Sequence, residues 1–349
     1  MHADVPILRS VKMDPLDEED LILIHALQIA PRVSWAAAAD ILGVNAQSLA
    51  QRWAGLRATG TAWITAGPGG IHGDLTTALI EVDCLPGGRP RAIQALCADP
   101  RVVTVEESTQ GRDLMLTVMT GDMAEMTFFL TDELIKAPGV ATIRTYLGTA
   151  MYRDGSSWRL QALSPHQVAA LEAEARATLR DGDVQPPKNA WPLIEALAAD
   201  GRRTAAELAQ ATGRNPSTVR RQLPRLLRSG LLSFRCEVAQ SFSGWPISCT
   251  WRCRVQPAHL DKTVDALSTL PNLRLCMSTT GNTNMLITVW ARDLPHIVRL
   301  EQLLGTKLPW MEILDSGVNL RTSKRVGWML DAYGRATGEV ITPTALRWR

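Results

Sequence analysis

The sequence predicts an α+β protein in which two helix-turn-helix domains alternate with two ferredoxin-like β-α-β-β-α-β domains. Three observations predict this: a helix-turn-helix pattern, the strand and helix patterns that follow it, and the recurrence of both about 170 residues later. "GVNAQSLAQRWAGLRATG" at 43–60 aligns with "GRNPSTVRRQLPRLLRSG" at 213–230, and "QGRDLMLTV" at 110–118 aligns with "TGNTNMLITV" at 280–289. We therefore interpret the chain as two units with the same domain order.

The first trihelical segment is predicted from apolar residues at helical spacing. "LDEEDLILIHALQIA" (16–30) carries acids in its first turn, where the helix dipole favours negative charge. Ser34 can cap a second helix (35–42), because its hydroxyl can accept from a free backbone N–H. Gly43 then permits a tight turn, and a third helix is predicted to begin near Ala46.

The second trihelical segment repeats this pattern. We predict a helix near 190–199, a helix capped by Thr204, a turn at Gly213 and a helix over 216–229. Pro224 lies inside the last helix and is expected to kink or shorten it, because proline removes one intrahelical hydrogen bond.

After each trihelical segment, strand and helix patterns follow in β-α-β-β-α-β order, which is typical of a four-stranded antiparallel sheet with two helices on one face. The predicted strands are 76–84, 101–109, 113–119 and 140–148 in the first unit, and 247–255, 272–280, 285–291 and 311–319 in the second. Asp122 and Asp293 are predicted to begin the second helix of each sheet domain. We expect the two sheet domains to pair within the chain and between chains.

These patterns divide the chain into six parts. They are a helix-turn-helix domain at 14–66, a sensor domain at 72–150, a connector at 151–188, a second helix-turn-helix domain at 189–238, a second sensor domain at 243–328, and a polar tail at 329–349 that we expect to be mobile.

The third helix of a helix-turn-helix motif enters the major groove of DNA, where arginine binds phosphates and guanine. Residues 201–235 contain eight Arg and one Glu, against three Arg and one Asp in 31–65, so the second domain is the more cationic. The alternative is an ordinary solvated helical face. The predicted DNA-binding residues are Asn45, Gln47, Ser48, Gln51, Arg52, Arg57, Arg214, Asn215, Ser217, Thr218, Arg220, Arg221, Arg225 and Arg228.

Small polar residues lie at the turn between the second and third strands of each sensor domain. Their hydroxyls and exposed backbone amides could hold a small ligand with a charged amine or carboxylate, although a plain hairpin turn is the alternative. The predicted ligand-binding residues are Thr109, Gly111, Asp113, Thr280, Gly281, Thr283 and Asn284.

The composition narrows the functional class. The formal net charge is only +2, the hydrophobic content is 46%, and no apolar run of membrane-spanning length or signal peptide is evident, so we expect a cytoplasmic protein. The six cysteines form no C-x-x-C pair and are expected to be reduced, apolar core residues. No phosphate-binding loop, dinucleotide fingerprint or metalloprotease motif is present, so we predict no catalytic residue, no metal, no cofactor and no enzyme activity.

The domain order, with a Thr-x-Gly-x-Asp-like turn, resembles the Lrp/AsnC (leucine-responsive, feast/famine) family of regulators. The resemblance covers "LDEEDLILIHALQIAPRVSWAAAADILGVNAQSLAQRWAGLRATG" and "STQGRDLMLTVMTGD" and their counterparts in the second unit. It implies a sequence-specific DNA-binding transcriptional regulator that responds to an amino acid or related metabolite. One chain with two units would imitate a dimer of the family, and the resemblance implies a homodimer or higher homo-oligomer. The turn departs from the family pattern in both units. In the first unit the turn that ends in Asp113 is one residue shorter, and in the second unit Asn284 stands in place of the aspartate.

Two alternatives stay open at this point. Sirohaem decarboxylases resemble these regulators in fold and can also be fused pairs, but they carry His- and Tyr-containing motifs near the turn between the second and third strands. That region has neither residue in either unit of this chain. The other alternative is a metabolite-sensing oligomeric scaffold that does not bind DNA.

Overall fold

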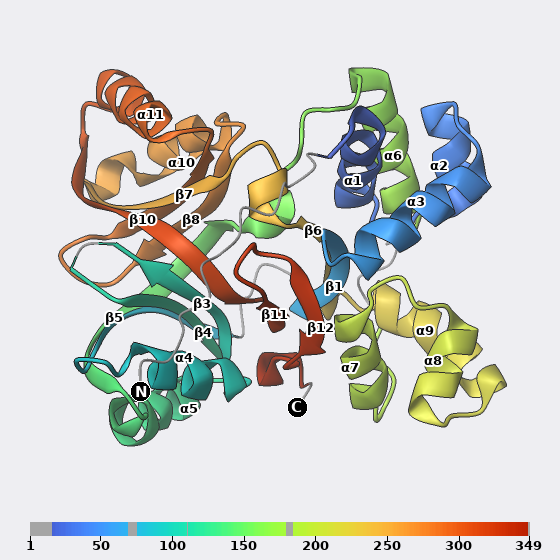
Figure 1. Ribbon diagram of the computed structural model, residues 1–349, viewed down its shortest axis with the longest axis horizontal. Helices are drawn as coiled ribbons and strands as arrows, with labels where there is room; N and C mark the ends of the chain where they lie inside the picture. The colour runs from blue at the N-terminus through green and yellow to red at the C-terminus, as the bar shows by residue number, and fades with distance from the viewer. Residues whose placement is uncertain (1–15, 69–74, 110, 179–183, 348–349) are drawn as a thin grey trace, which may run out of the picture.

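The structure is a computed structural model, which describes residues 16–68, 75–109, 111–178 and 184–347. Helical domains lie on one side of the molecule and the sheets of the sensor domains on the other (Figure 1). The predicted fold class is confirmed, since helix-turn-helix and ferredoxin-like domains are both present. The predicted domain starts at 14 and 72 lie outside the described residues, and the domain boundaries stay predictions.

Each helix-turn-helix domain contains three helices. They are α1 (Glu18–Ile29), α2 (Trp35–Leu42) and α3 (Ala46–Ala58) in the first domain, and α7 (Trp191–Ala199), α8 (Ala205–Thr212) and α9 (Pro216–Arg228) in the second. Ser34 and Thr204 cap α2 and α8 through their side-chain oxygens, as the sequence predicts. Gly43 and Gly213 end these two helices in the left-handed conformation, with φ of 72° and 64°, which favours glycine.

Pro224 was expected to kink or shorten α9, and the shortening is wrong, because the helix continues to Arg228. Val219, Leu223 and Leu226 lie on one buried face of α9 and pack into the core of the second helical domain. These contacts lie on both sides of Pro224, so packing holds the helix where one backbone hydrogen bond is missing.

A two-stranded sheet connects the two helical domains. Strand β1 (Ala62–Pro68) follows α3, strand β6 (Leu232–Val238) follows α9, and the two pair in antiparallel register from Ala62 opposite Val238 to Pro68 opposite Leu232. The helical domains are therefore joined by backbone hydrogen bonds between segments about 170 residues apart.

The sensor domains have the predicted β-α-β-β-α-β order. The elements are β2 (Thr76–Cys84), α4 (Arg89–Ala98), β3 (Val102–Ser108), β4 (Leu114–Thr120), α5 (Met123–Phe128) and β5 (Val140–Arg153) in the first, and β7 (Ile247–Val255), α10 (Leu260–Ser268), β8 (Leu273–Thr279), β9 (Met285–Ala291), α11 (Leu294–Lys307) and β10 (Met311–Arg325) in the second. A π-helical and a 3-10 turn, η1 (Phe129–Glu133) and η2 (Leu134–Lys136), follow α5. Asp122 and Asp293 cap α5 and α11, as predicted.

The eight sensor strands close into one barrel. Their order is β10-β3-β4-β2-β5-β8-β9-β7, and β7 also pairs with β10. The contacts between the two domains are β5 with β8 and β10 with β3. Apolar side chains from both domains meet inside the barrel, namely Leu79, Met115, Met277 and Leu286. The sensor domains thus pair within the chain, as we expected.

The connector and the C-terminal segment both carry regular structure. The connector contains η3 (Gly155–Ser157) and α6 (Pro165–Thr178), and α6 packs on α1 and α2. The expectation that 329–349 is a mobile tail is wrong, because β11 (Trp328–Leu330) and β12 (Ala336–Val340) extend the sheet beyond β10. The buried Trp328 stacks on Trp63, with 5.8 Å between ring centroids, so a few apolar residues anchor an otherwise polar segment.

The remaining short 3-10 helices are η4 (Gln240–Phe242), η5 (Pro257–His259) and η6 (Thr344–Leu346). Within the described ranges, no helix is long and apolar enough to cross a membrane. All six cysteines have free thiols, and all except Cys84 are buried.

Candidate functional site

The outer face of α9 is cationic and exposed. Arg220, Arg221 and Arg225 are exposed on it, and none of them forms an ion pair with a described residue. Arg225 donates to the backbone oxygen of Gln185, at 3.4 Å, and Arg228 donates to the backbone oxygen of Pro224, at 3.3 Å. These guanidinium groups are therefore available to bind phosphates.

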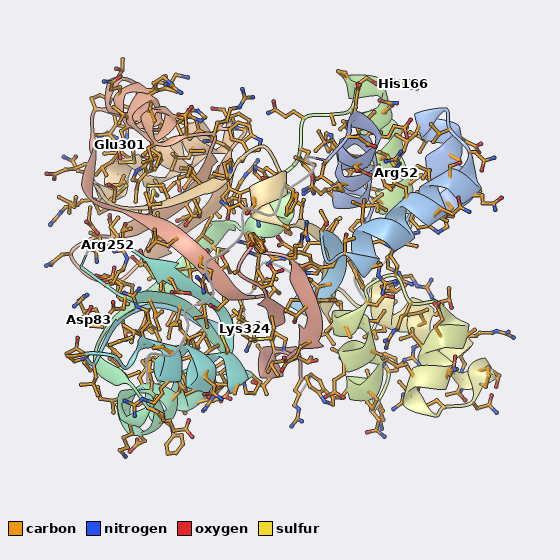
Figure 2. The ribbon with its side chains drawn as sticks, in the orientation of Figure 1. Arg52, Asp83, His166, Arg252, Glu301 and Lys324 are labelled. Atoms are coloured by element: carbon orange, nitrogen blue, oxygen red, sulfur yellow. The ribbon has the colours of Figure 1, made fainter. Side chains whose placement is uncertain are left out.

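The equivalent face of α3 is nearly neutral. Arg52 of α3 forms ion pairs with Asp17 and Asp20, both at 2.8 Å, and with Glu19 at the start of α1 (Figure 2). Asp20 and Asp17 raise the pKa of the Arg52 guanidinium, and the three carboxylates occupy its donors. Arg57 pairs with Asp200 of the second helical domain at 3.0 Å. The two helices that sequence analysis treats as DNA-reading helices therefore differ in electrostatic character.

The other predicted DNA-binding residues divide into caps and exposed polar groups. Asn45 accepts from the backbone N–H of Gln47 at 2.8 Å, and Asn215 accepts from that of Ser217 at 2.9 Å, so both asparagines serve as helix caps. Arg214 is half-buried and donates to Gln222, at 3.1 Å, and to the backbone of Asn189. The side chains that stay exposed on the two helices are Gln47, Ser48, Gln51 and Ser217, and Thr218 is half-buried.

The predicted ligand-binding turns connect the two sensor domains. The hydroxyl of Thr109 accepts from the N–H of Val318 in β10 at 3.0 Å. The hydroxyl of Thr280 accepts from the N–H of Leu147 in β5 at 3.2 Å. Each threonine thus binds the last strand of the other sensor domain, and the two contacts are equivalent in the two units.

The remaining turn residues also have partners within the chain. The carboxylate of Asp113 accepts from the N–H of Cys84 at 2.7 Å and from Arg89. Asn284 exchanges two hydrogen bonds of 2.8 Å with the backbone of Val255. The oxygens of Gly111 and Thr283 accept from Arg144 and Thr279, and Gly281 lies next to Tyr146. A role for these turns in ligand binding stays a prediction.

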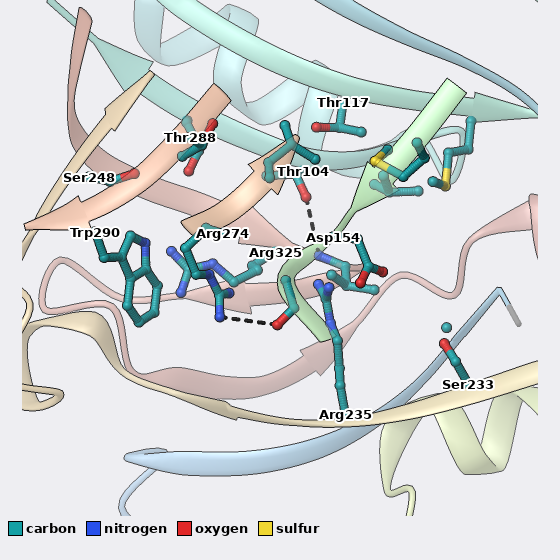
Figure 3. A pocket seen from close by; sticks show the side chains of 18 residues that line it. Thr104, Thr117, Asp154, Ser233, Arg235, Ser248, Arg274, Thr288, Trp290 and Arg325 are labelled. Atoms are coloured by element: carbon teal, nitrogen blue, oxygen red, sulfur yellow. Dashed lines mark hydrogen bonds between the residues drawn. The ribbon is translucent and has the colours of Figure 1, made fainter. Parts of the chain in front are cut away.

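A cavity of about 150 Å³ lies at the end of the barrel that faces β1 and β6 (Figure 3). Arg235 of β6, Arg274 of β8 and Arg325 of β10 bring three guanidinium groups to it. Trp290 forms one wall, and Arg274 stacks on its ring with 4.1 Å between the guanidinium carbon and the ring centroid. We call this cavity the arginine pocket.

One buried carboxylate balances part of the positive charge of the arginine pocket. Glu237 of β6 lies 2.9 Å from Arg235, 3.2 Å from Arg274 and 3.9 Å from Arg325. Burial alone would raise the pKa of Glu237, but the guanidinium groups of Arg235 and Arg274 lower it to about 2. Burial lowers the pKa of Arg274 to about 10. Glu237 and Arg274 are therefore both charged at neutral pH.

A second carboxyl group, Glu106 of β3, also lines the arginine pocket. Removal of Glu106 from bulk water raises its pKa, and the positive charge of Arg325 and Arg274 opposes this rise only in part. A protonated Glu106 can donate a hydrogen bond, which a carboxylate cannot.

The arginine pocket was not predicted from the sequence, because its three arginines come from three separate strands with no common spacing. The available signal was an arginine inside an apolar strand run, as in "NLRLCMSTT" (272–280), where a half-buried strand needs a partner for the charge. No cluster of possible metal ligands occurs within the described residues.

Comparison with known proteins identifies two domain types in the chain. The profile of the Lrp/AsnC ligand binding domain matches residues 77–156, and that of a winged helix-turn-helix DNA-binding domain matches residues 193–233. An uncharacterised HTH-type transcriptional regulator of Pyrococcus abyssi (strain GE5 / Orsay) is 27% identical over 108 residues, which cover 31% of this chain and 68% of that protein.

Two solved structures resemble the chain over nearly its whole length. One is a crystal structure of the siroheme decarboxylase NirDL with an iron-uroporphyrin III analogue, which has a TM-score of 0.53 at 15% identity. The match covers 95% of this chain and 97% of the NirDL chain. A second NirDL structure has a TM-score of 0.51 at 14% identity, with coverage of 88% and 93%. At these identities the likeness is one of fold.

This likeness overturns the prediction that the chain is not an enzyme. The prediction relied on missing catalytic motifs and on a fold typical of regulators. Because an enzyme has the same fold along nearly the whole chain, neither argument excludes catalysis.

Proposed function

We propose that this chain, which carries an Lrp/AsnC ligand binding domain and a winged helix-turn-helix domain, is a DNA-binding transcriptional regulator of the Lrp/AsnC type that binds specific DNA sequences mainly through α9. The observation that carries this proposal is the contrast between the two reading helices. Arg220 and Arg221 of α9 are exposed without ion-pair partners among the described residues, whereas Arg52 of α3 is bound by three carboxylates.

The proposal includes an asymmetric operator. The α9 helix would place cationic side chains against phosphates, and α3 would contribute polar contacts from Gln47, Ser48 and Gln51, which are exposed. Because the two reading helices differ, the stretch of DNA bound by one chain has no reason to be palindromic. We further propose that the protein acts in the cytoplasm as a homodimer or higher oligomer, and that a small metabolite controls DNA binding through the sensor domains.

The test is selection of binding sites from a random DNA library, followed by fluorescence anisotropy on the selected site at several salt concentrations. Replacing both Arg220 and Arg221 with Ala should lower affinity at least tenfold and reduce the salt slope by about two, since each phosphate contact contributes about one. Replacing Gln47 and Gln51 with Ala should lower affinity less and leave the salt slope unchanged.

The matched control is Arg299→Ala on α11, which removes an exposed arginine of the barrel and should leave DNA binding unchanged. The proposal fails if selection yields no preferred sequence, or if the arginine and glutamine pairs lose affinity equally with the same salt slope.

A decarboxylase is the second candidate, because the likeness to NirDL extends over nearly the whole chain and the arginine pocket suits carboxylate groups. In such a reaction the bond between a substrate carboxylate and its methylene carbon breaks, carbon dioxide leaves and a proton takes its place. A pocket of about 150 Å³ would have to open to admit a tetrapyrrole. Incubation with siroheme should then change the absorbance spectrum of the siroheme and yield products that have lost carbon dioxide, measured by mass spectrometry. An unchanged spectrum and mass would exclude this candidate.

A further inference from the structure

The arginine pocket lies apart from the turns predicted to bind ligand, and it has the features of a built binding site. We propose that the arginine pocket binds a small organic acid, with the carboxylate of the ligand held by Arg235, Arg274 and Arg325 and its uncharged part against Trp290. The regulatory part of this inference rests on the proposed function, whereas the binding part does not.

An unmatched guanidinium N–H supports an anionic ligand. Arg235, Arg274 and Arg325 form ion pairs with one shared carboxylate, that of Glu237, which is 2% exposed, and the acids Glu106 and Asp154 also line the pocket. The Nη1 atom of Arg325 is buried without a hydrogen-bond acceptor among the described residues, and its distance to Glu237 is 3.9 Å. A buried guanidinium N–H without an acceptor is costly, so an acceptor supplied by a ligand would be strongly favoured.

The lining of the pocket favours an organic acid over a simple inorganic anion. The indole of Trp290 and the side chains of Met119 and Met151 offer apolar surface next to the arginines. Hydroxyl groups lie on the barrel strands opposite, from Thr117 and Thr288 (Figure 3). A phosphate ion would leave this apolar surface unused, whereas an acid with a small apolar body would cover it.

The volume sets the size of the ligand. The cavity measures about 150 Å³, and an engineered protein cavity of about 150 Å³ holds benzene. The ligand therefore has about six to ten non-hydrogen atoms, by that comparison. Glu106 could donate a hydrogen bond to the ligand when it is protonated, and burial raises its pKa in that direction.

The position of the pocket allows a bound ligand to influence the DNA-binding part of the molecule. Arg235 belongs to β6, which follows α9 after a short turn, and Gly67 of β1 also lines the cavity. A ligand bound to Arg235 and Arg274 at once would hold the β1–β6 sheet against the barrel, since these residues belong to the two different sheets. Through this contact, ligand binding would restrict how the two helical domains move relative to the barrel.

The binding test uses named probes on the full chain. Benzoate, phenylacetate and glutarate are titrated by calorimetry, beside benzamide, phenylacetamide and inorganic phosphate. At least one acid should bind with a measurable heat and raise Tm, while its amide should bind at least tenfold more weakly. Arg325→Met should lower the affinity for that acid at least tenfold, and Arg325→Lys should recover part of it.

Because Arg325→Met removes a buried charge and could fail to fold, Arg235→Gln provides a second variant at a less buried position, where the side chain is 14% exposed. Arg144→Gln, at an exposed position outside the pocket, is the matched control and should bind the acid normally. The proposal is overturned if no acid binds to folded protein, if acids and amides bind equally, or if phosphate binds as tightly as the acids.

DNA affinity is measured separately, with and without the acid. Specific DNA binding without any acid binding would support the proposed function and overturn the pocket. Acid binding without any specific DNA binding would support the pocket and overturn the proposed function. A change in DNA affinity of at least threefold on adding the acid, absent in Arg235→Gln, would support the regulatory link, and an unchanged affinity would overturn it.

Discussion

Arg32 and Arg202 occupy equivalent positions in the two units, and each donates to backbone oxygens of the loop that contains the other. Arg202 donates to the oxygens of Pro31, at 2.8 Å, and Val33, at 2.7 Å. Arg32 donates to those of Gly201 and Arg203, the latter at 3.1 Å. This is the reciprocal pattern of a two-fold interface, formed here within one chain. It fixes the spacing of the two helical domains.

Replacing Arg202 with Met should therefore loosen the pairing of the helical domains. The change removes two hydrogen bonds to a charged group and the stacking of Arg202 on Trp35, whose ring centroid is 3.9 Å away. We expect a loss of about 1.5–3 kcal/mol in the free energy of unfolding by urea. The double variant with Arg32→Met should lose less than the sum of the two single losses, since both contacts belong to one interface. Additive losses would contradict this interpretation.

A buried ion pair between the sensor domains predicts a large effect of charge removal. Glu81 of β2 is 1% exposed and accepts from Arg112 and Arg252, both at 2.6 Å, and Arg252 comes from the other sensor domain (Figure 2). Glu81→Gln leaves these buried arginines without their main partner and should cost about 3–5 kcal/mol in urea unfolding. Asp83→Asn, which affects the surface pair with Arg144 and a hydrogen bond from Thr142, should cost no more than about 1 kcal/mol. Similar losses in both variants would rule out a special role for the buried pair.

From the environment of His25, we predict that the stability of the folded protein falls in mild acid. Its Nδ1 accepts from the backbone N–H groups of Ala162 and Leu163 at 3.1 and 3.2 Å, and burial lowers its pKa to about 4. The ordinary pKa of histidine in an unfolded chain is about 6.5. A base whose pKa is lowered by folding stabilises the protein above its unfolded pKa, so this contribution should be lost as the pH falls from about 6.5 to about 4.

The measurement is the free energy of urea unfolding between pH 7 and pH 4.5. The wild-type protein should lose about 1–3 kcal/mol over this range through His25. His25→Asn keeps an acceptor near the same place but cannot titrate, so its pH dependence should be smaller by that amount. Parallel pH curves for the two proteins would show that His25 does not carry the effect.

Trp328 predicts that the C-terminal segment contributes to global stability. Its indole N–H donates to the backbone oxygen of Ala198 at 3.1 Å, and its ring stacks on Trp63. Trp328→Ala should cost about 3–5 kcal/mol, the usual effect of removing a buried aromatic side chain. Leu320→Ala is the control, because Leu320 is 63% exposed and should change stability by no more than about 0.5 kcal/mol. A Tm of Trp328→Ala equal to that of wild type would contradict the role of this segment.

The sequence allowed the individual elements to be predicted, because helix caps and apolar periodicity are local signals. The strands over 76–84 and 247–255 have the predicted limits. Two others are longer than predicted: β5 continues to Arg153 and β10 to Arg325. The added residues are those that pair with β8 and β3 of the other sensor domain. Such pairing depends on tertiary contacts that no local pattern reports.

The candidate site was predictable to a smaller extent, for the same reason. The cationic face of α9 is one continuous segment, so its charge could be counted. The neutralisation of Arg52 depends on acids about 35 residues earlier, and the arginine pocket depends on three strands meeting. Both features could therefore be recognised only in the folded structure.

The closed barrel also has a consequence for partner choice. In a barrel assembled from two separate chains, related proteins can exchange halves and form mixed species. Here β5 pairs with β8 and β10 with β3 within a single chain, so both junctions are filled as the protein folds. Because both halves belong to one polypeptide, they are always made in equal amounts. A mutation in one half therefore always acts in a barrel that contains the same second half. One unit can therefore specialise in holding DNA while the other retains a different task, without competition from hybrids.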